Sequence, residues 1–311
     1  MIKRLVNGTW YPEITEDEIR RAAVAENRFS GRISADGSSG FPAAAGRYHL
    51  YVCYACPFAH RTLIARKLKN LEHIISISVL DPYWGRADGW TFSDCEGCTP
   101  DTANGFRFLH QVYTRANPDY TGRVTVPLLW DKKTGTAVNN ESAEIIRMFN
   151  SEFNAFGDAS IDLYPAQLRQ EIDDINGFVQ RYVNTGVYRA GFARTQEQYD
   201  QAVDELFQAL DELELRLGHH PYLVGDQPTE ADWRLFPTLV RFDVVYYGAL
   251  KCNLRRLVDY PNLWRYTRSL YRVPGIADTV HLDHIKRHYY DHYTGIINRM
   301  IVPRGPLVEF A

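Results

Sequence analysis

The feature that most constrains the fold of this chain is a cysteine placed where a strand gives way to a helix. Residues 48–52 (YHLYV) have the apolar and aromatic composition of a strand, and residues 62–68 (TLIARKL) have the apolar spacing of an amphipathic helix. Cys56 and Pro57 stand between them. Proline is favoured in the first turn of a helix, where its missing N–H group costs nothing. The pattern predicts a helix that begins directly after Cys56.

A thiol in this position has unusual chemistry. Its sulfur faces the unsatisfied N–H groups and the positive dipole end of the helix, and His60 and Arg61 follow closely. These surroundings favour the thiolate, so Cys56 is predicted to be a nucleophile at neutral pH. The alternative is a buried structural thiol, because free cysteines are often small core residues.

The pattern along the chain predicts two domains with an extension at either end. A chain of 311 residues is long enough for about two domains. Residues 47–155 predict an α/β domain that contains a strand–helix–strand unit with a parallel sheet, and residues 165–280 predict an all-α domain. Residues 1–46 are expected to form an extended arm, and residues 281–311 a C-terminal extension.

The individual elements follow from apolar periodicity and turn residues. Thr229 and Asp232 form a capping-box-like start for one helix of the second domain. The expected strands are 48–52, 73–80 and 124–131, with a hairpin turn at 133–135, and the expected helices are 16–25, 57–70, 106–115, 143–153, 167–182, 196–217, 230–247 and 263–271.

Composition argues against several classes of function. The chain has 35 basic and 38 acidic residues and a net charge of −3, which offers no positive field to attract nucleic acid. No window approaches 18 apolar residues, and the N-terminus lacks the apolar stretch of a signal peptide. Five cysteines, an odd number, do not suggest a disulfide framework. We expect a cytoplasmic protein that binds neither nucleic acid nor membranes.

Six short motifs stand in a distinctive order along the chain. They are 56–62 (CPFAHRT), 89–92 (GWTF), 123–127 (RVTVP), 141–143 (ESA), 186–188 (GVY) and 285–290 (IKRHYY). Together with the domain order, they resemble the glutathione transferase superfamily, and more narrowly its Xi class, the glutathionyl-hydroquinone reductases. The resemblance implies a thioredoxin-like N-terminal domain, a helical-bundle C-terminal domain, an active site between the two, and a homodimer. The family usually has tryptophan where this chain has Phe58, which we expect to change packing and not chemistry.

The resemblance also implies a reaction. Cys56 would attack the sulfur that joins glutathione to a hydroquinone ring, so that hydroquinone leaves and a Cys56–glutathione disulfide remains. A second glutathione would then attack that disulfide, giving oxidised glutathione and free enzyme. Glutathione is thus expected as a co-substrate, and no metal or nicotinamide is needed.

By the same resemblance, three residues would hold the cysteinyl and γ-glutamyl parts of glutathione. Val126 would precede a cis proline, Pro127, and pair its backbone with the cysteinyl part of glutathione. Glu141 and Ser142 would meet the γ-glutamyl ammonium and carboxylate at a helix N-terminus. A plain edge-strand proline and simple helix capping would explain these residues as well.

Four further residues match positions of the family's site. Trp90 and Arg123 match residues that contact glutathione, although packing and a solvated turn would explain them equally. Tyr188 and Tyr289 match tyrosines of the hydroquinone site, where phenolic hydroxyls can bond a substrate oxygen and stabilise the leaving ring. Without the resemblance, tyrosines on helices would be interpreted as core or interface residues.

Other interpretations stay open. The chain could be an omega-like thiol transferase or dehydroascorbate reductase, or a transferase-like binding module without catalysis. Cys53 could be a bystander or a resolving thiol, and Cys95 with Cys98 could bind zinc or form a disulfide. His284 and His288 have the spacing of metal ligands, although solvated or dimer-facing histidines fit equally. The sequence does not identify the physiological quinone or the native thiol.

Overall fold

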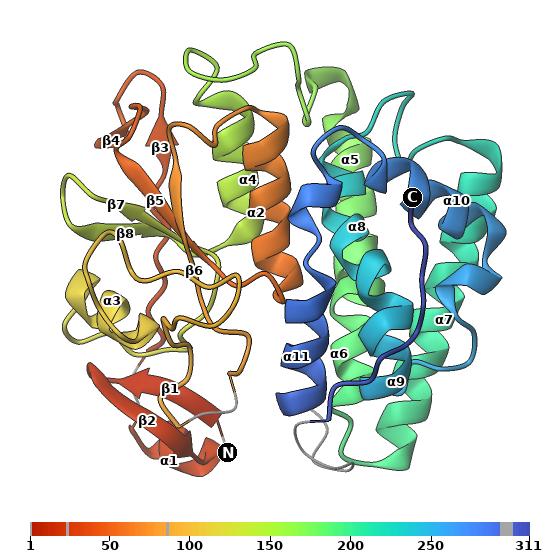
Figure 1. The fold of residues 1–311 in the computed structure, drawn as a ribbon, viewed down its shortest axis with the longest axis horizontal. Helices are drawn as coiled ribbons and strands as arrows, with labels where there is room; N and C mark the ends of the chain where they lie inside the picture. The colour runs from red at the N-terminus through yellow and green to blue at the C-terminus, as the bar shows by residue number, and fades with distance from the viewer. Residues whose placement is uncertain (1, 23–24, 85–86, 293–300) are drawn as a thin grey trace. The chain divides into compact units, whose positions relative to one another are not determined.

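The chain folds into two compact units, Met1–Ser160 and Ile161–Ala311. The structure is a computed structural model that describes residues 2–22, 25–84, 87–292 and 301–311 (Figure 1). Each unit has its own apolar core. The finer division predicted from the sequence, with extensions at both ends, stays a prediction.

The first unit is built on a four-stranded mixed sheet. Its strands are β5 (Tyr48–Val52), β6 (Ser76–Val79), β7 (Leu128–Asp131) and β8 (Thr136–Asn139), in the spatial order β6-β5-β7-β8. β5 and β6 are parallel, whereas β7 is antiparallel to both β5 and β8. The predicted parallel strand–helix–strand unit and the predicted hairpin are therefore confirmed.

Three helices complete the predicted order. α2 (Pro57–Leu68) and α4 (Ser142–Ser151) pack side by side (Figure 1). α3 (Leu109–Ala116) packs against β8. The strand predicted at 124–131 is shorter than expected and begins at Leu128, because Pro127 has no N–H group to donate to the sheet.

The N-terminal arm has more regular structure than the sequence analysis predicted. β1 (Ile2–Val6) and β2 (Thr9–Ile14) form an antiparallel hairpin, and α1 (Glu16–Ala22) follows. β2 is mostly exposed, so it lacks the apolar alternation that reveals a strand. The signal that was present is the Asn7-Gly8 turn, whose positive φ angles of 46° and 72° are those a tight hairpin requires.

The arm continues along the outer edge of the sheet. The Gly31 N–H group donates to the Val138 carbonyl at 2.7 Å, and Ser30 forms an antiparallel bridge with Asn139. Two short strands, β3 (Ile33–Ser34) and β4 (Phe41–Pro42), pair in parallel just beyond. The arm thus lies against β8.

The second unit is all-helical, as predicted. None of the described helices is long and apolar enough to cross a membrane. The unit contains the α-helices α5 (Arg169–Phe178), α6 (Gly186–Gly191), α7 (Gln196–His219), α8 (Glu230–Arg241), α9 (Tyr247–Ala249), α10 (Pro261–Tyr271) and α11 (Leu282–His292), the π-helical turns η2 (Val179–Asn184) and η3 (Phe242–Tyr246), and the 3₁₀ turns η1 (Ala166–Leu168), η4 (Leu257–Asp259) and η5 (Ala277–Thr279).

The predicted capping box of α8 is present and buried. Asp232 accepts hydrogen bonds from the Thr229 N–H group at 2.7 Å, the Thr229 hydroxyl at 3.1 Å and the Leu223 N–H group at 2.9 Å. The Tyr266 hydroxyl donates a further bond at 2.7 Å from α10. One carboxylate therefore joins the start of α8, the preceding loop and a neighbouring helix.

A buried histidine in β5 predicts acid sensitivity. His49 is fully buried, with Nδ1 2.8 Å from the Ser76 hydroxyl, and burial lowers its pKa to about 4. Because the unfolded chain binds the proton at an ordinary pKa, this stability is complete above pH ~6.5 and is lost as the pH falls towards 4. We expect His49→Gln to reduce the loss of unfolding free energy between pH 7 and 4 by about 3 kcal/mol.

Urea unfolding curves at several pH values measure this difference. The matched control is His73→Gln, which removes an exposed histidine from the same unit. A His49→Gln chain whose stability falls with pH as steeply as that of the unsubstituted chain would contradict the prediction.

Candidate active site

Cys56 lies at the N-terminus of α2, as predicted. It is the N-cap residue, with extended backbone angles, and Pro57 occupies the first turn. Its Sγ donates to the Val126 carbonyl at 3.6 Å, and the first turn of α2 contains no acidic residue. The half-buried sulfur therefore stands at the positive end of a helix with no carboxylate of that turn to oppose an anion.

The backbone beside this sulfur has the predicted conformation. The Val126-Pro127 peptide bond is cis, which confirms that expectation, and both residues are buried. The Tyr113 hydroxyl donates to the Thr125 carbonyl at 2.8 Å and holds the segment from α3. An extended peptide segment thus lies next to the thiol.

The start of α4 brings a second set of polar groups together. Glu141 caps the helix, and its Oε1 accepts from the Ala143 N–H group at 3.1 Å and from the Ser142 hydroxyl at 3.3 Å. Arg61, on α2, donates from Nη1 to the Ser142 Oγ at 3.4 Å. Glu141 therefore does cap α4. The Arg61 guanidinium and the N-terminus of α4 together form a site suited to an anion.

Arg61 is a candidate site residue that the sequence analysis placed only near Cys56. It is 2 % exposed, and its guanidinium carbon lies 4.8 Å from the centre of the Phe58 ring. The sequence shows that Arg61 follows Cys56 on the same helix. It does not show that Arg61 contacts Ser142.

Trp90 and Arg123 differ in burial. Trp90 is buried, its ring centre lies 6.0 Å from that of Trp84, and its carbonyl accepts the Leu109 N–H group at 2.9 Å. The Arg123 side chain is exposed. Their contact with glutathione stays a prediction.

In the second unit, three tyrosine hydroxyls converge. Tyr188 of α6 and Tyr289 of α11 have hydroxyl oxygens 2.6 Å apart. The Tyr246 hydroxyl, from the π-helical turn η3, lies 3.3 Å from that of Tyr289 and 3.5 Å from that of Tyr188. Tyr246 and Tyr289 are buried, whereas Tyr188 is half-exposed. The sequence analysis paired Tyr188 with Tyr289 and missed Tyr246.

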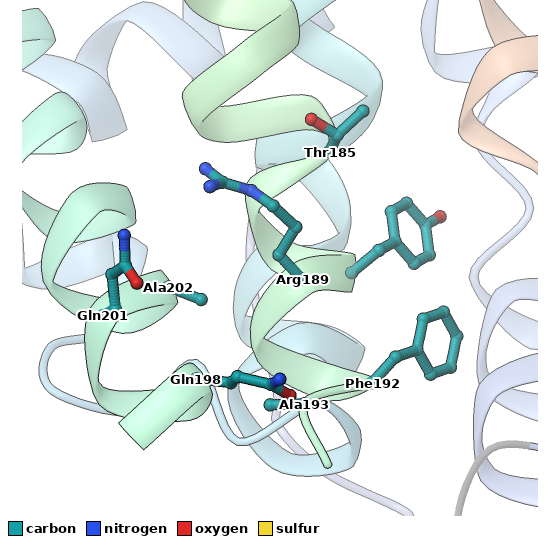
Figure 2. Close-up of a pocket in the computed structure, with 8 residues that line it drawn as sticks. Thr185, Arg189, Phe192, Ala193, Gln198, Gln201 and Ala202 are labelled. Carbon is teal, nitrogen blue, oxygen red and sulfur yellow. The ribbon is translucent and has the colours of Figure 1, made fainter. Parts of the chain in front are cut away.

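A cavity of about 510 Å³ lies between α6 and the start of α7 (Figure 2), and Tyr188 is one of its lining residues. Phe192, 52 % exposed, stacks on Tyr188 with ring centres 6.0 Å apart. Tyr188 therefore reaches both the cavity and the hydroxyl cluster. The other lining residues are Thr185, Arg189, Ala193, Gln198, Gln201 and Ala202.

The remaining cysteines and histidines take other positions. All five cysteines are free thiols, and burial raises the pKa of Cys53 well above its usual value, which opposes a resolving role. His284 and His288 are buried, and the His288 ring packs against Tyr289. Within the described residues, no three His, Cys, Asp or Glu side chains are grouped closely enough to hold a metal ion.

Comparisons with known proteins agree with this architecture. Residues 55–152 match the glutathione S-transferase N-terminal domain, and residues 196–269 match the C-terminal domain. Glutathionyl-hydroquinone reductase YqjG of Escherichia coli is 50% identical over 98% of this chain and 94% of its own. The reductase PcpF of Sphingobium chlorophenolicum is 49% identical over 97% and 96%.

Solved structures show the same similarity. A Xi-class glutathione transferase from Natrialba magadii superposes with a TM-score of 0.94 at 47% identity, covering 99% of this chain and 94% of that one. Glutathione-bound YqjG superposes with a TM-score of 0.91 at 48% identity, covering 99% and 96%. The predicted fold is thereby confirmed, and the chain belongs to the glutathione transferase family, within its Xi class of glutathionyl-hydroquinone reductases.

Proposed function

We propose that this protein reduces glutathionyl-hydroquinones to hydroquinones and that Cys56 is its nucleophile. The observation that carries the proposal is the Cys56 sulfur at the N-terminus of α2, 3.6 Å from the carbonyl that precedes the cis proline. YqjG and PcpF, which are about half identical to this chain, carry the name of this reductase.

The reaction is a thiol transfer in two steps. The Cys56 thiolate attacks the glutathione sulfur, the bond from that sulfur to the ring carbon breaks, and the ring carbon takes a proton. A second glutathione then attacks the Cys56–glutathione disulfide, which releases oxidised glutathione and returns the thiolate. The ring carbon gains the electron pair in the first step, and two glutathione sulfurs are oxidised overall.

The first unit supplies the groups that suit glutathione. We assign the Val126 backbone to the cysteinyl part and the α4 N-terminus, with Glu141 and Ser142, to the γ-glutamyl part. Arg61 adds positive charge beside Ser142, which favours a carboxylate there. Trp90 and the exposed Arg123 complete the proposed contacts.

The tyrosine cluster of the second unit suits the ring that leaves. The hydroxyl oxygens lie 2.6 Å and 3.3 Å apart and can hydrogen-bond one another. A hydroxyl of such a network can also donate a hydrogen bond to a substrate oxygen. We assign Tyr188 and Tyr289 to this role, in which they stabilise the charge that develops on the ring.

We further propose a cytoplasmic homodimer that acts on glutathione and aromatic hydroquinone conjugates, without a metal, a nicotinamide, nucleic acid or a membrane. The net charge of −3 argues against nucleic acid, and the electron balance of the two steps requires neither a metal nor a nicotinamide.

A steady-state assay tests the function directly. Purified protein would be given glutathionyl-menadiol and glutathione, and the release of menadiol and of oxidised glutathione would be followed together. Equal release of both products supports the proposal. Binding of glutathione without release of menadiol would contradict it and favour mixed-disulfide substrates.

Replacing one hydroxyl of the cluster should slow the reaction strongly. We expect Tyr289→Phe to lower kcat/KM for glutathionyl-menadiol by about 100-fold, because it removes a donor aimed at developing charge. The control is Tyr290→Phe, one residue along α11, whose hydroxyl bonds the Val244 carbonyl at 3.4 Å. Equal activities of the two variants would show that the Tyr289 hydroxyl does not contribute to the reaction.

A further inference from the structure

The long insertion between β6 and α3 contains a pair of cysteines that the proposed reaction does not use. Cys95 and Cys98 are the first and last residues of a tight turn, closed by the Cys98 N–H group donating to the Cys95 carbonyl at 2.8 Å. Gly97 has a φ of 79°, which a turn of this kind requires at its third position. Both cysteines are half-exposed free thiols.

The two ends of this turn are close enough for a disulfide. In a β-turn the first and fourth Cα atoms lie less than about 7 Å apart, and a disulfide needs roughly 4.4–6.8 Å. The two thiols already interact: burial raises the pKa of Cys98 to about 12, and the charge of Cys95 and a hydrogen bond with it raise that pKa further. Closing the bond therefore needs little movement of the backbone.

The neighbouring backbone holds both ends of the turn in place. The Thr99 N–H group donates to the Val79 carbonyl of β6 at 3.0 Å, and the Thr99 hydroxyl accepts from the Val79 N–H group at 2.8 Å. On the other side, the Cys95 N–H group donates to the Ser93 hydroxyl at 3.3 Å. The pair is thus anchored to the sheet, while Glu96 and Gly97 face solvent.

We propose that Cys95 and Cys98 form a reversible disulfide whose oxidant is oxidised glutathione, so that the protein carries a second redox centre besides Cys56. The proposal rests on the proposed function only for the source of that oxidant, which is the second product of the reaction. A pair this close to solvent can meet a tripeptide disulfide without unfolding of the chain.

The chemistry balances in two exchanges. The Cys95 thiolate attacks one sulfur of oxidised glutathione, which forms a Cys95–glutathione disulfide and releases one glutathione thiolate. Cys98 then gives up its proton and attacks the Cys95 sulfur, which releases the second glutathione. Two cysteine thiols are oxidised and one glutathione disulfide is reduced. We assign the first attack to Cys95, and single-cysteine variants test that order.

The test uses the full chain with Cys56→Ser, which lacks the proposed nucleophile of the reductase reaction. Reduced protein would be incubated without oxygen in excess oxidised glutathione, quenched in acid and alkylated. Trypsin then releases residues 87–107, a peptide that contains these two cysteines and no others. Mass spectrometry should show complete loss of alkylation at both cysteines and loss of two hydrogens, and excess glutathione should reverse both.

Two further variants in the same background define the order of attack. With Cys98→Ser, the peptide should keep one glutathione on Cys95; with Cys95→Ser, Cys98 should remain a thiol that is alkylated after the quench. A parent peptide that stays alkylated at both cysteines, or carries two glutathiones, overturns the proposal. Because oxidised glutathione is added directly, failure of the reductase assay and failure of this test are separate results.

Discussion

Cys56→Ser is expected to lower the rate of hydroquinone release by at least about 1,000-fold. A hydroxyl at the N-terminus of α2 cannot form the disulfide with glutathione on which the second step depends, so no covalent route remains. The rate of menadiol release at saturating glutathione measures the effect. Isothermal titration with glutathione should still show binding, which would separate loss of chemistry from loss of the site.

The matched control is Cys53→Ala, three residues earlier. The Cys53 thiol is buried, and its pKa is raised by that burial, so it should take no part in the reaction. We expect turnover near that of the unsubstituted protein. A Cys53→Ala variant as inactive as Cys56→Ser would mean that the two thiols act as a pair, and a Cys56→Ser variant with substantial turnover would exclude Cys56 as the nucleophile.

Asp232→Ala should destabilise the second unit by about 3 kcal/mol or more. The substitution leaves the Leu223 and Thr229 N–H groups and the Tyr266 hydroxyl without their buried acceptor, and each such loss costs about 1–3 kcal/mol. It also removes half of the capping box of α8. Urea unfolding followed by circular dichroism measures the change in midpoint.

Asp204→Ala is the control, because it removes an exposed aspartate from the middle of α7 in the same unit. Its effect should stay within about 0.5 kcal/mol. Equal unfolding midpoints for Asp232→Ala and the unsubstituted protein would show that the cap does not hold the unit together.

The sequence was sufficient where a strong local pattern coincides with the element. Residues 48–52 were predicted as a strand and form β5, and Cys56 was predicted at the start of the helix that begins at Pro57. The predicted start of the next strand, at residue 124, was wrong. The apolar composition of 124–127 suggested a strand there, but Pro127 has no N–H group to donate to the sheet, and β7 begins at Leu128. The β1–β2 hairpin was not predicted, because β2 is mostly exposed and lacks apolar alternation, although Asn7-Gly8 marked its turn.

The candidate site was predictable in part, and the remainder depends on distant contacts. The cis bond before Pro127 followed from the family resemblance and is present. The contact of Arg61 with Ser142 joins residues 81 positions apart, and the Tyr246 hydroxyl meets that of Tyr289 across 43 positions. The residues around Tyr246 in the sequence do not distinguish it from the other tyrosines, of which the chain has 20 in all. Only the packing of η3 against α11 brings its hydroxyl to that of Tyr289.

The arm beside β8 has a consequence for how the protein behaves in concentrated solution. β8 is the last strand of its sheet, and a bare strand edge offers its hydrogen-bonding groups to any strand of another molecule, which is a common route to aggregation. The Gly31 N–H group and Ser30 occupy part of that edge. Both lie upstream of residue 55, where the match to the N-terminal domain of the family begins. The arm therefore guards against self-association from a stretch of chain that precedes the matched N-terminal domain.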